Sequence, residues 1–193
     1  MKALNKKDLI NIGIFNAVAV ALYFAIGVAT SGVPVLHVFG VTPIAALISG
    51  AIYLLMVMKV KKKGVFLISG IVQGIVFSLM LGLYASIVII PLLGFIADMI
   101  CGNFSAKKLL VTAYGIFMVG IYYGQIFFML FFTKLYLSFY SGNMLAHKQA
   151  AADRITGPIV LLLTLIILAA SAIGGALGCR ILKKHFVKAG IVS

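Results

Sequence analysis

The chain has 193 residues, of which 64% are apolar and 10% charged, and its 16 basic residues outnumber 3 acidic ones to give a net charge of +13. Soluble domains are about 45–50% apolar and about 25% charged, so this composition excludes a soluble enzyme, a nucleic-acid-binding module and a disordered segment. We therefore expect residues 1–193 to form one integral membrane domain in contact with the lipid bilayer and not with nucleic acid.

Six apolar segments are long enough to cross a membrane as helices, because a ~30 Å hydrocarbon core needs about 20 residues. They are residues 9–29, 41–58, 64–82, 84–101, 109–132 and 157–179. The fifth could continue to Tyr140. The start of the fourth is open, because almost no polar residue separates Leu83 from Ile90, and Pro91 then kinks or restarts the helix. The sequence predicts an all-α membrane protein with six transmembrane helices.

The basic residues lie mostly at one end of these segments. Thirteen of them precede the first segment or follow the second, fourth and sixth, whereas Lys134, Lys148 and Arg154 lie at the other end. Basic residues concentrate in cytoplasmic links, so this bias predicts that both termini are cytoplasmic. The longer links 30–40 and 138–156 are then outside the cell.

The first outer link, 30–40, is unusually apolar for a segment at the water interface, and His37 is its only titratable residue. One interpretation is a lid over a pocket, in which His37 faces a ligand as a hydrogen-bonding or metal-coordinating group. The alternative is an interfacial loop whose apolar residues touch lipid and whose histidine points to water.

Further candidate ligand contacts are polar or aromatic side chains in the late segments. Tyr122, Tyr123 and Gln125 lie near the middle of the fifth segment, and Tyr84 lies near the outer end of the fourth. Polar groups at this depth are costly unless they face the bundle interior. Rings with an amide suit a flat, partly polar ligand. Interhelical hydrogen bonding is the alternative, which we favour for Gln73 and leave open for Gln125.

The last outer link, 138–156, adds Asn143 and Arg154 as candidate ligand contacts, since an arginine can meet an anionic group. Asp153 is expected to cap the helix of the sixth segment. Asp98, the only acidic residue within a predicted span, is expected to pair with a cytoplasmic lysine or to cap a neighbouring helix. Cys101 and Cys179 are expected to be free thiols without a metal or disulfide role.

Small residues recur every four positions in the first segment, at Gly13, Ala17, Ala21 and Ala25. This spacing forms one narrow helix face that a second helix can approach closely. Similar spacing occurs at residues 70 and 74, 120 and 124, and 170, 174 and 178. The face in the first segment therefore serves either packing within the bundle or docking of a partner.

Motifs for catalysis and ATP hydrolysis are missing from the sequence: it has no Walker A, HExxH, GxSxG or paired-carboxylate motif, and no glutamate. We expect neither enzymatic activity nor a cofactor, and energy for transport would come from other subunits. A membrane-embedded enzyme acting on lipid or peptide is a weaker alternative, because His37, His147 and His185 are scattered. A scaffold subunit without a ligand is another.

The small-residue face, the apolar first outer link, the aspartate near the inner end of the fourth of six segments and the cytoplasmic termini resemble the substrate-binding S component of an energy-coupling factor (ECF) transporter. The opening residues KDLINIGIFNAVAVALYFAIG and the layout of nearly the whole chain look most like the Trep_Strep subgroup.

The resemblance implies a bacterial plasma-membrane subunit of an ATP-binding-cassette importer, which captures a vitamin or similar micronutrient at its outer face. Its implied partners are a transmembrane coupling subunit and two cytoplasmic ATPase subunits. Ala17, Ala21 and Ala25 match the family's docking surface for the coupling subunit, and the residues near His37 match its gating first loop.

The family's ligand-binding positions change with each ligand and do not transfer to this chain. The ligand is expected between the first outer link and the outer halves of the fourth to sixth segments. The chain has no tryptophan, so tyrosine and phenylalanine would have to stack on the ligand. Haem or another flat-ring ligand is an alternative, suggested by His37, His147 and several methionines.

Overall fold

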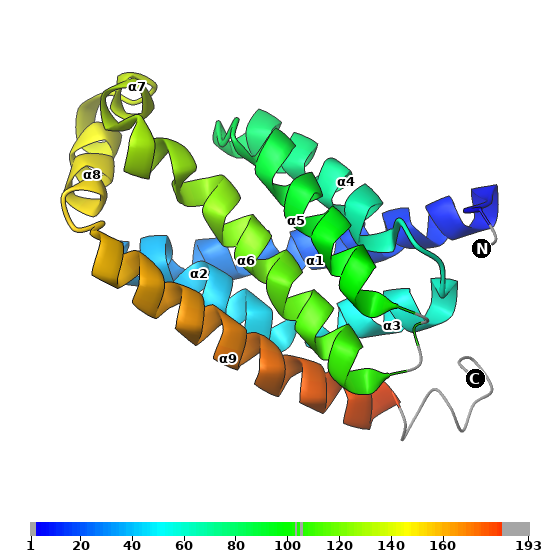
Figure 1. Cartoon of the computed structure of the whole chain (residues 1–193). Helices are drawn as coiled ribbons and strands as arrows, with labels where there is room; N and C mark the ends of the chain where they lie inside the picture. Colours follow the sequence, from blue (N-terminus) through cyan, green and yellow to red (C-terminus); the bar gives the residue numbers. More distant parts are fainter. Residues whose placement is uncertain (1–2, 103, 105, 183–193) are drawn as a thin grey trace.

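The structure is a computed structural model of the chain and describes residues 3–102, 104 and 106–182. Lys2, Lys183, Lys184, His185, Lys188 and the side chains of Asn143 and His147 lie outside the described part. Within that part the regular structure is helical (Figure 1). The helices are α1 (Lys6–Thr30), α2 (Pro34–Ile48), α3 (Gly50–Val60), α4 (Val65–Leu81), α5 (Ser86–Cys101), α6 (Lys107–Phe131), α7 (Thr133–Ser138), α8 (Gly142–Ala152) and α9 (Gly157–Ile181).

The predicted apolar segments are all helical, but the second one is broken. It consists of α2 and α3, whose axes bend by 49° at the single residue Ser49 between them. The fourth begins at Ser86 and passes through Pro91 without ending. The fifth ends at Phe131 and does not continue to Tyr140.

Both longer links contain more helix than the sequence predicts. The first link, expected at 30–40, is reduced to residues 31–33, because α2 already begins at Pro34. Proline suits the first turn of a helix, where its missing N–H has no partner to lose and its fixed φ matches the helix. The second link, expected at 138–156, contains α8.

Among the described residues, three helices of 25 residues, α1, α6 and α9, are long and apolar enough to cross a membrane. The bent pair α2–α3 makes a fourth candidate span if it is counted as one. Helices α4 and α5 are also apolar but shorter, with 17 and 16 residues. Large apolar side chains are widely exposed, for example Leu79 at 79% and Val28 at 74%. Such a surface fits lipid and not water.

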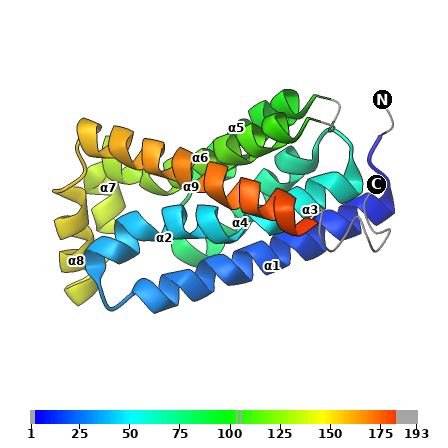
Figure 2. The same ribbon diagram turned by 90° about the horizontal axis from the view of Figure 1, so that it is seen from below.

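These apolar helices form a closed ring. Each helix contacts the next one around the ring: α1 contacts α4, α4 contacts α5, α5 contacts α6, and α6 contacts α9. Helix α9 then contacts both α2 and α3, and both of these contact α1. In Figure 1, α5 and α6 lie in front of α1, and Figure 2 shows α1 along one edge of the bundle. The short helices α7 and α8 lie at the end where α1 finishes and α2 begins.

Glycine allows close approach at several of the helix contacts. A Cβ at Gly70 of α4 would lie 2.8 Å from the backbone of Pro91 in α5. One at Gly178 of α9 would lie 2.9 Å from the backbone of Ala51 in α3. Both are too short for a real Cβ contact, so these small residues serve packing inside the bundle.

Asp98 caps a neighbouring helix, which is one of the two roles that the sequence predicts for it. Its carboxylate oxygens accept hydrogen bonds from the backbone N–H groups of Phe66 (3.2 Å) and Leu67 (2.9 Å) in the first turn of α4. These amides have no partner within their own helix, and a negative charge there is favoured by the helix dipole. Asp98 thereby fixes α5 against the start of α4.

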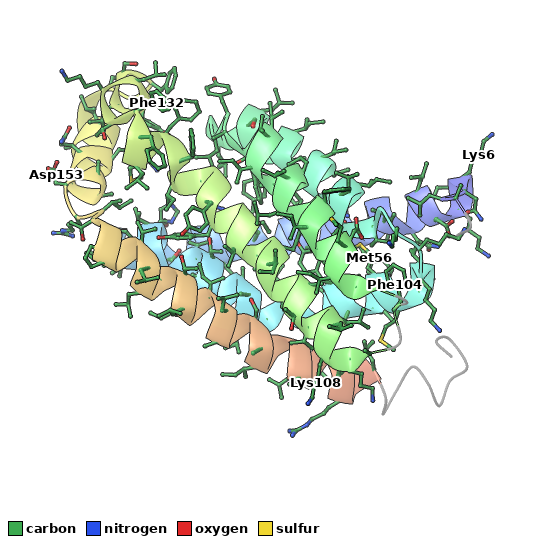
Figure 3. All side chains as sticks on the ribbon, in the orientation of Figure 1. Lys6, Met56, Phe104, Lys108, Phe132 and Asp153 are labelled. Carbon is green, nitrogen blue, oxygen red and sulfur yellow. The ribbon has the colours of Figure 1, made fainter. Side chains whose placement is uncertain are left out.

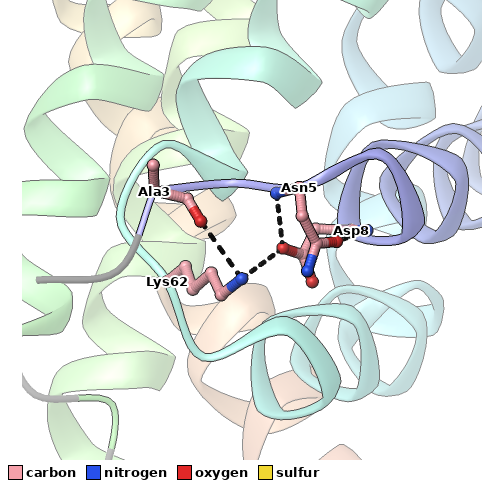
Figure 4. A network of polar contacts seen from close by, with 4 residues as sticks. All are labelled: Ala3, Asn5, Asp8 and Lys62. Carbon is pink, nitrogen blue, oxygen red and sulfur yellow. Dashed lines mark hydrogen bonds and ion pairs between the residues drawn. The ribbon is translucent and has the colours of Figure 1, made fainter.

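Asp8 closes the same end of the bundle through a different contact (Figure 4). The Asn5 side chain accepts from Asp8 N (2.9 Å), and Asp8 accepts from Asn5 N (2.8 Å), which forms a capping box at the start of α1. Lys62, in the link between α3 and α4, lies 2.5 Å from the same carboxylate and also donates to Ala3 O (3.2 Å). The start of α1 is therefore tied to the α3–α4 link.

Acid is expected to remove the contribution of this contact to stability. Asp8 precedes the first apolar run, and the hydrogen bond from the Asn5 backbone, followed by that from Lys62, lowers its pKa below the ordinary 3.8. A carboxyl group with a lowered folded-state pKa stabilises the fold above its unfolded-state pKa and loses that contribution as pH falls through the folded-state value. The Tm difference between wild type and Asp8→Asn, measured in detergent, is therefore expected to be constant above about pH 5 and to vanish in stronger acid. A difference unchanged down to about pH 2 would contradict this assignment.

Candidate functional site

The interior of the ring holds two groups of hydrogen-bonded polar side chains. In the first, the Gln73 amide donates to Asn16 Oδ1 (2.6 Å) and Tyr53 OH (2.7 Å). Asn16 Nδ2 in turn donates to Ser69 Oγ (2.9 Å) and to the carbonyl of Ile12 (2.8 Å). All four polar side chains are buried and bonded, so this group joins α1, α3 and α4. The interhelical role predicted for Gln73 is confirmed, whereas Asn16 was not foreseen.

The second group consists of Tyr23, Thr42 and Gln125, and we call it the outer triad because it lies toward the end of the bundle that the sequence predicts to be outside the cell. The Gln125 amide donates to Tyr23 OH (2.5 Å), Tyr23 OH lies 2.9 Å from Thr42 Oγ1, and Thr42 Oγ1 donates to Gln125 Oε1 (3.4 Å). These residues come from α1, α2 and α6. Since α1 and α6 are not neighbours in the ring, the outer triad spans the bundle interior.

Tyr122 precedes Gln125 by three residues on α6, so both lie on the same side of that helix. Its side chain is 1% exposed, and its hydroxyl has no hydrogen-bond partner among the described residues. Buried hydroxyls are nearly always bonded, so this one has unused capacity to bind a polar atom. Tyr123, by contrast, uses its hydroxyl within the bundle, 3.2 Å from Thr164 Oγ1 of α9.

His37 lies in the first turn of α2, half-buried against the end of α1. Its Nδ1 is 3.0 Å from the carbonyl of Gly27 and 3.4 Å from Thr30 Oγ1. The ring is therefore anchored to α1 through one nitrogen, and its predicted contact with a ligand stays a prediction.

Helices α7 and α8 cover the end of the bundle that holds the outer triad. Met129 of α6, Tyr136 of α7 and Ala151 of α8 form a small buried cluster, and Val38 of α2 packs against it. Helices α7 and α8, together with the start of α2, thus close this end of the bundle.

The remaining predicted contacts belong to this cover and its surroundings. Tyr84 is half-exposed, with its ring centroid 5.5 Å from that of Phe139, which follows α7. Arg154 is exposed beyond the end of α8, and Asn143 lies in its first turn. In the described part of the chain, no hydrogen bond or ring contact joins Tyr84 or Arg154 to Tyr122 or Gln125.

The predicted cap at Asp153 is wrong. Helix α8 extends to Ala152, so Asp153 closes that helix and accepts a hydrogen bond from the Gln149 amide (2.7 Å). The N-cap residue of α9 is Thr156.

The small residues of α1 lie on the outside of the bundle. Gly13, Ala17, Ala21 and Ala25 are all exposed, and a Cβ at Gly13 would have no neighbouring atom within 4 Å. The equally spaced glycines of α4, α6 and α9 behave differently, because each of them lies against another helix. Packing within the bundle therefore does not explain the small-residue face of α1.

Neither cysteine forms a disulfide: Cys101 is buried and Cys179 is partly buried, both as free thiols. In residues 3–102, 104 and 106–182, no group of three or more His, Cys, Asp or Glu side chains could hold a metal ion. The candidate ligand site thus consists of neutral hydrogen-bonding and aromatic groups around the outer triad.

A ring of long apolar helices with an apolar exterior defines a multi-pass membrane protein. Comparison with known proteins agrees: the model of a family described as a hypothetical bacterial integral membrane protein (Trep_Strep) matches residues 6–188. The chain belongs to this family, and it is a multi-pass protein of the bacterial membrane. No curated protein and no solved structure matches it.

Proposed function

We propose that this chain is the substrate-capturing S component of an ECF-type importer. In this proposal it binds a vitamin or similar micronutrient at its outer face and catalyses no reaction. It docks on a transmembrane coupling subunit, and two cytoplasmic ATPase subunits drive the import. The observation that carries the proposal is the exposed small-residue face of α1, formed by Gly13, Ala17, Ala21 and Ala25.

Contact with a partner helix explains the small-residue face better than contact with lipid alone. A lipid-facing helix gains nothing from small side chains, whereas a second helix can approach closely only where side chains are small. In α4 and α9 the same spacing coincides with close helix contacts, at Gly70 and Gly178. In α1 no described part of the chain supplies the second helix, so we assign that position to the coupling subunit.

In this proposal all six segments of the ring cross the membrane, with α2–α3 as one broken span, and both termini are cytoplasmic. The closed ring supports it, because each segment has a neighbour on both sides. Helix α4, with 17 residues, is at the lower limit of the range of about 17–25 for a span, and α5, with 16, is one residue below it. The concentration of lysines at one end supports the orientation.

We place the ligand around the outer triad and Tyr122. Amide and hydroxyl groups fix the orientation of a small molecule, and aromatic rings cover its apolar part. The Tyr122 hydroxyl supports this position, because it is buried without a partner among the described residues. Access would require the cover of α7 and α8 to move. Candidates along that route or beside it are His37, Tyr84, Tyr123, Asn143 and Arg154.

Native mass spectrometry of the purified full-length chain tests this proposal. We expect one small molecule to be retained by the wild type. Tyr122→Phe is expected to lower retention about tenfold, the effect of losing one buried hydrogen bond at the upper end of the usual range. Gln125→Ala is expected to lower it further, because it also breaks the outer triad.

Tyr114→Phe is the matched control. It removes another buried tyrosine hydroxyl from α6, one that contacts Ser49 Oγ (3.0 Å) and the carbonyl of Ala46 (2.6 Å) away from the proposed site. This variant is expected to lose stability and to keep the ligand. A chain that retains no small molecule, or Tyr114→Phe and Tyr122→Phe losing it equally, would contradict the proposed site.

A further inference from the structure

A groove of about 590 Å³ lies between the first turns of α6 and the last turns of α9, at the end of the bundle opposite the outer triad. Its polar lining comes from Lys107, Lys108, Thr112 and Arg180, and Val111 and Ala176 contribute apolar wall. In Figure 3, Lys108 marks this corner of the molecule, far from Asp153 at the other end. The groove thus combines three cationic side chains with an apolar surface.

No acidic side chain of this chain is left to neutralise the groove. The sequence contains three acidic residues. Asp8 pairs with Lys62, Asp98 is bonded to the first turn of α4, and Asp153 lies at the opposite end of the bundle. Helix α6 also begins here without a side-chain cap, so its first amides add to the positive potential. The cationic side chains of the groove are therefore free of acidic side-chain partners among the described residues and can receive an anionic group from another molecule.

We propose that this groove binds the headgroup of an anionic phospholipid. The groove lies where two 25-residue apolar helices end, which is the depth of a lipid phosphate at the membrane surface. Exposed apolar side chains, Ile173 and Leu177 of α9, continue from it toward the middle of the bundle, where acyl chains would pack. A basic pocket between membrane helices is a recognised form of headgroup site.

The combination of charge and position favours a lipid over a free anion. A free phosphate would use only the cationic side chains, whereas a phospholipid also uses the apolar wall and the exposed flank of α9. The inference depends on the membrane location of the chain, and it holds whether or not the chain captures a micronutrient.

A lipid titration read by native mass spectrometry tests the proposal. The purified full-length chain is titrated with phosphatidylglycerol and, separately, with phosphatidylcholine that carries the same acyl chains. Wild type is expected to bind phosphatidylglycerol at least about tenfold more tightly, because each basic residue near a membrane surface contributes roughly a factor of five. The variant Lys107→Gln/Lys108→Gln/Arg180→Gln is expected to bind both lipids alike. The matched control Lys6→Gln/Lys7→Gln/Lys63→Gln, which removes three exposed charges elsewhere, is expected to keep the preference.

A second variant distinguishes the effect of the groove's shape from the effect of its charge. It also tests the proposal if the triple variant does not fold. Ala176→Leu narrows the groove and keeps every charge, and it is expected to weaken phosphatidylglycerol binding severalfold. If the control triple variant lost the preference for phosphatidylglycerol equally, the preference would come from diffuse surface charge, and that outcome would overturn the proposal. So would displacement of phosphatidylglycerol by millimolar inorganic phosphate, or recovery of an acidic protein in the groove with no preference for the anionic lipid.

Discussion

Replacing Ala17 and Ala21 with leucine is expected to separate the chain from the proposed coupling subunit and ATPases while the chain stays folded. Both alanines are exposed on α1, so the larger side chains meet nothing within the bundle. A partner helix that approaches closely at these positions would be pushed away. With the tagged chain purified from its native membranes, we expect the recovered ATPase per chain to fall at least about tenfold, as for an overpacked helix contact costing 1.4 kcal/mol or more.

The matched control is Ala169→Leu/Ala172→Leu on α9. These alanines are also exposed, and α9 is not adjacent to α1 in the ring. This variant is expected to recover as much ATPase as the wild type. The α1 variant is also expected to retain its small molecule, because the outer triad is untouched. Undiminished recovery in the α1 variant, or equal loss in both, would contradict docking through this face.

Gly174→Leu is expected to have the largest effect on stability. Gly174 of α9 lies against the backbone of Ala46 and Leu47 in α2, and there is no room there for a Cβ. A leucine would force α9 away from α2 and open the ring, at a cost of about 3 kcal/mol or more. We expect little monodisperse protein, and a Tm in detergent lowered by several degrees in what remains.

Gly13→Leu is the control for stability. A Cβ at Gly13 has no neighbour within 4 Å, and leucine favours a helix by up to about 1 kcal/mol over glycine. The Tm of this variant is expected to equal or exceed that of the wild type. A lowered Tm for Gly13→Leu, or a normal one for Gly174→Leu, would show that the ring packs differently.

Much of the fold could be predicted from apolar runs and charge, since these fix where helices must lie in a membrane. The ends of α4, α5, α6 and α9 agree with the predicted segments within a few residues. The break at Ser49 could not be predicted, because the apolar run continues through it, and the contacts of α2 and α3 with α9 depend on how the whole ring packs. The helical start of α2 had a signal in Pro34, which suits a first helical turn as well as a loop.

The candidate site was predicted only in part. Gln125 and Tyr122 stood out as polar groups in an apolar helix, but their neighbours on other helices depend on how the ring closes. Asn16 and Tyr23 are seven residues apart in α1 and so face the same side, a signal that could have marked them as inward-facing. The predicted cap at Asp153 is wrong because the link contains α8, which extends to Ala152 and leaves Asp153 at its own end and not at the start of α9.

ATP-dependent uptake tests the central claim most directly. The complex purified through this chain is reconstituted in liposomes, with ATP on the side of the ATPase subunits. The small molecule identified on the chain is then supplied on the other side. The account predicts that the molecule accumulates against its gradient only when both ATP and this chain are present. Accumulation by this chain alone, or accumulation that does not respond to ATP, would contradict it.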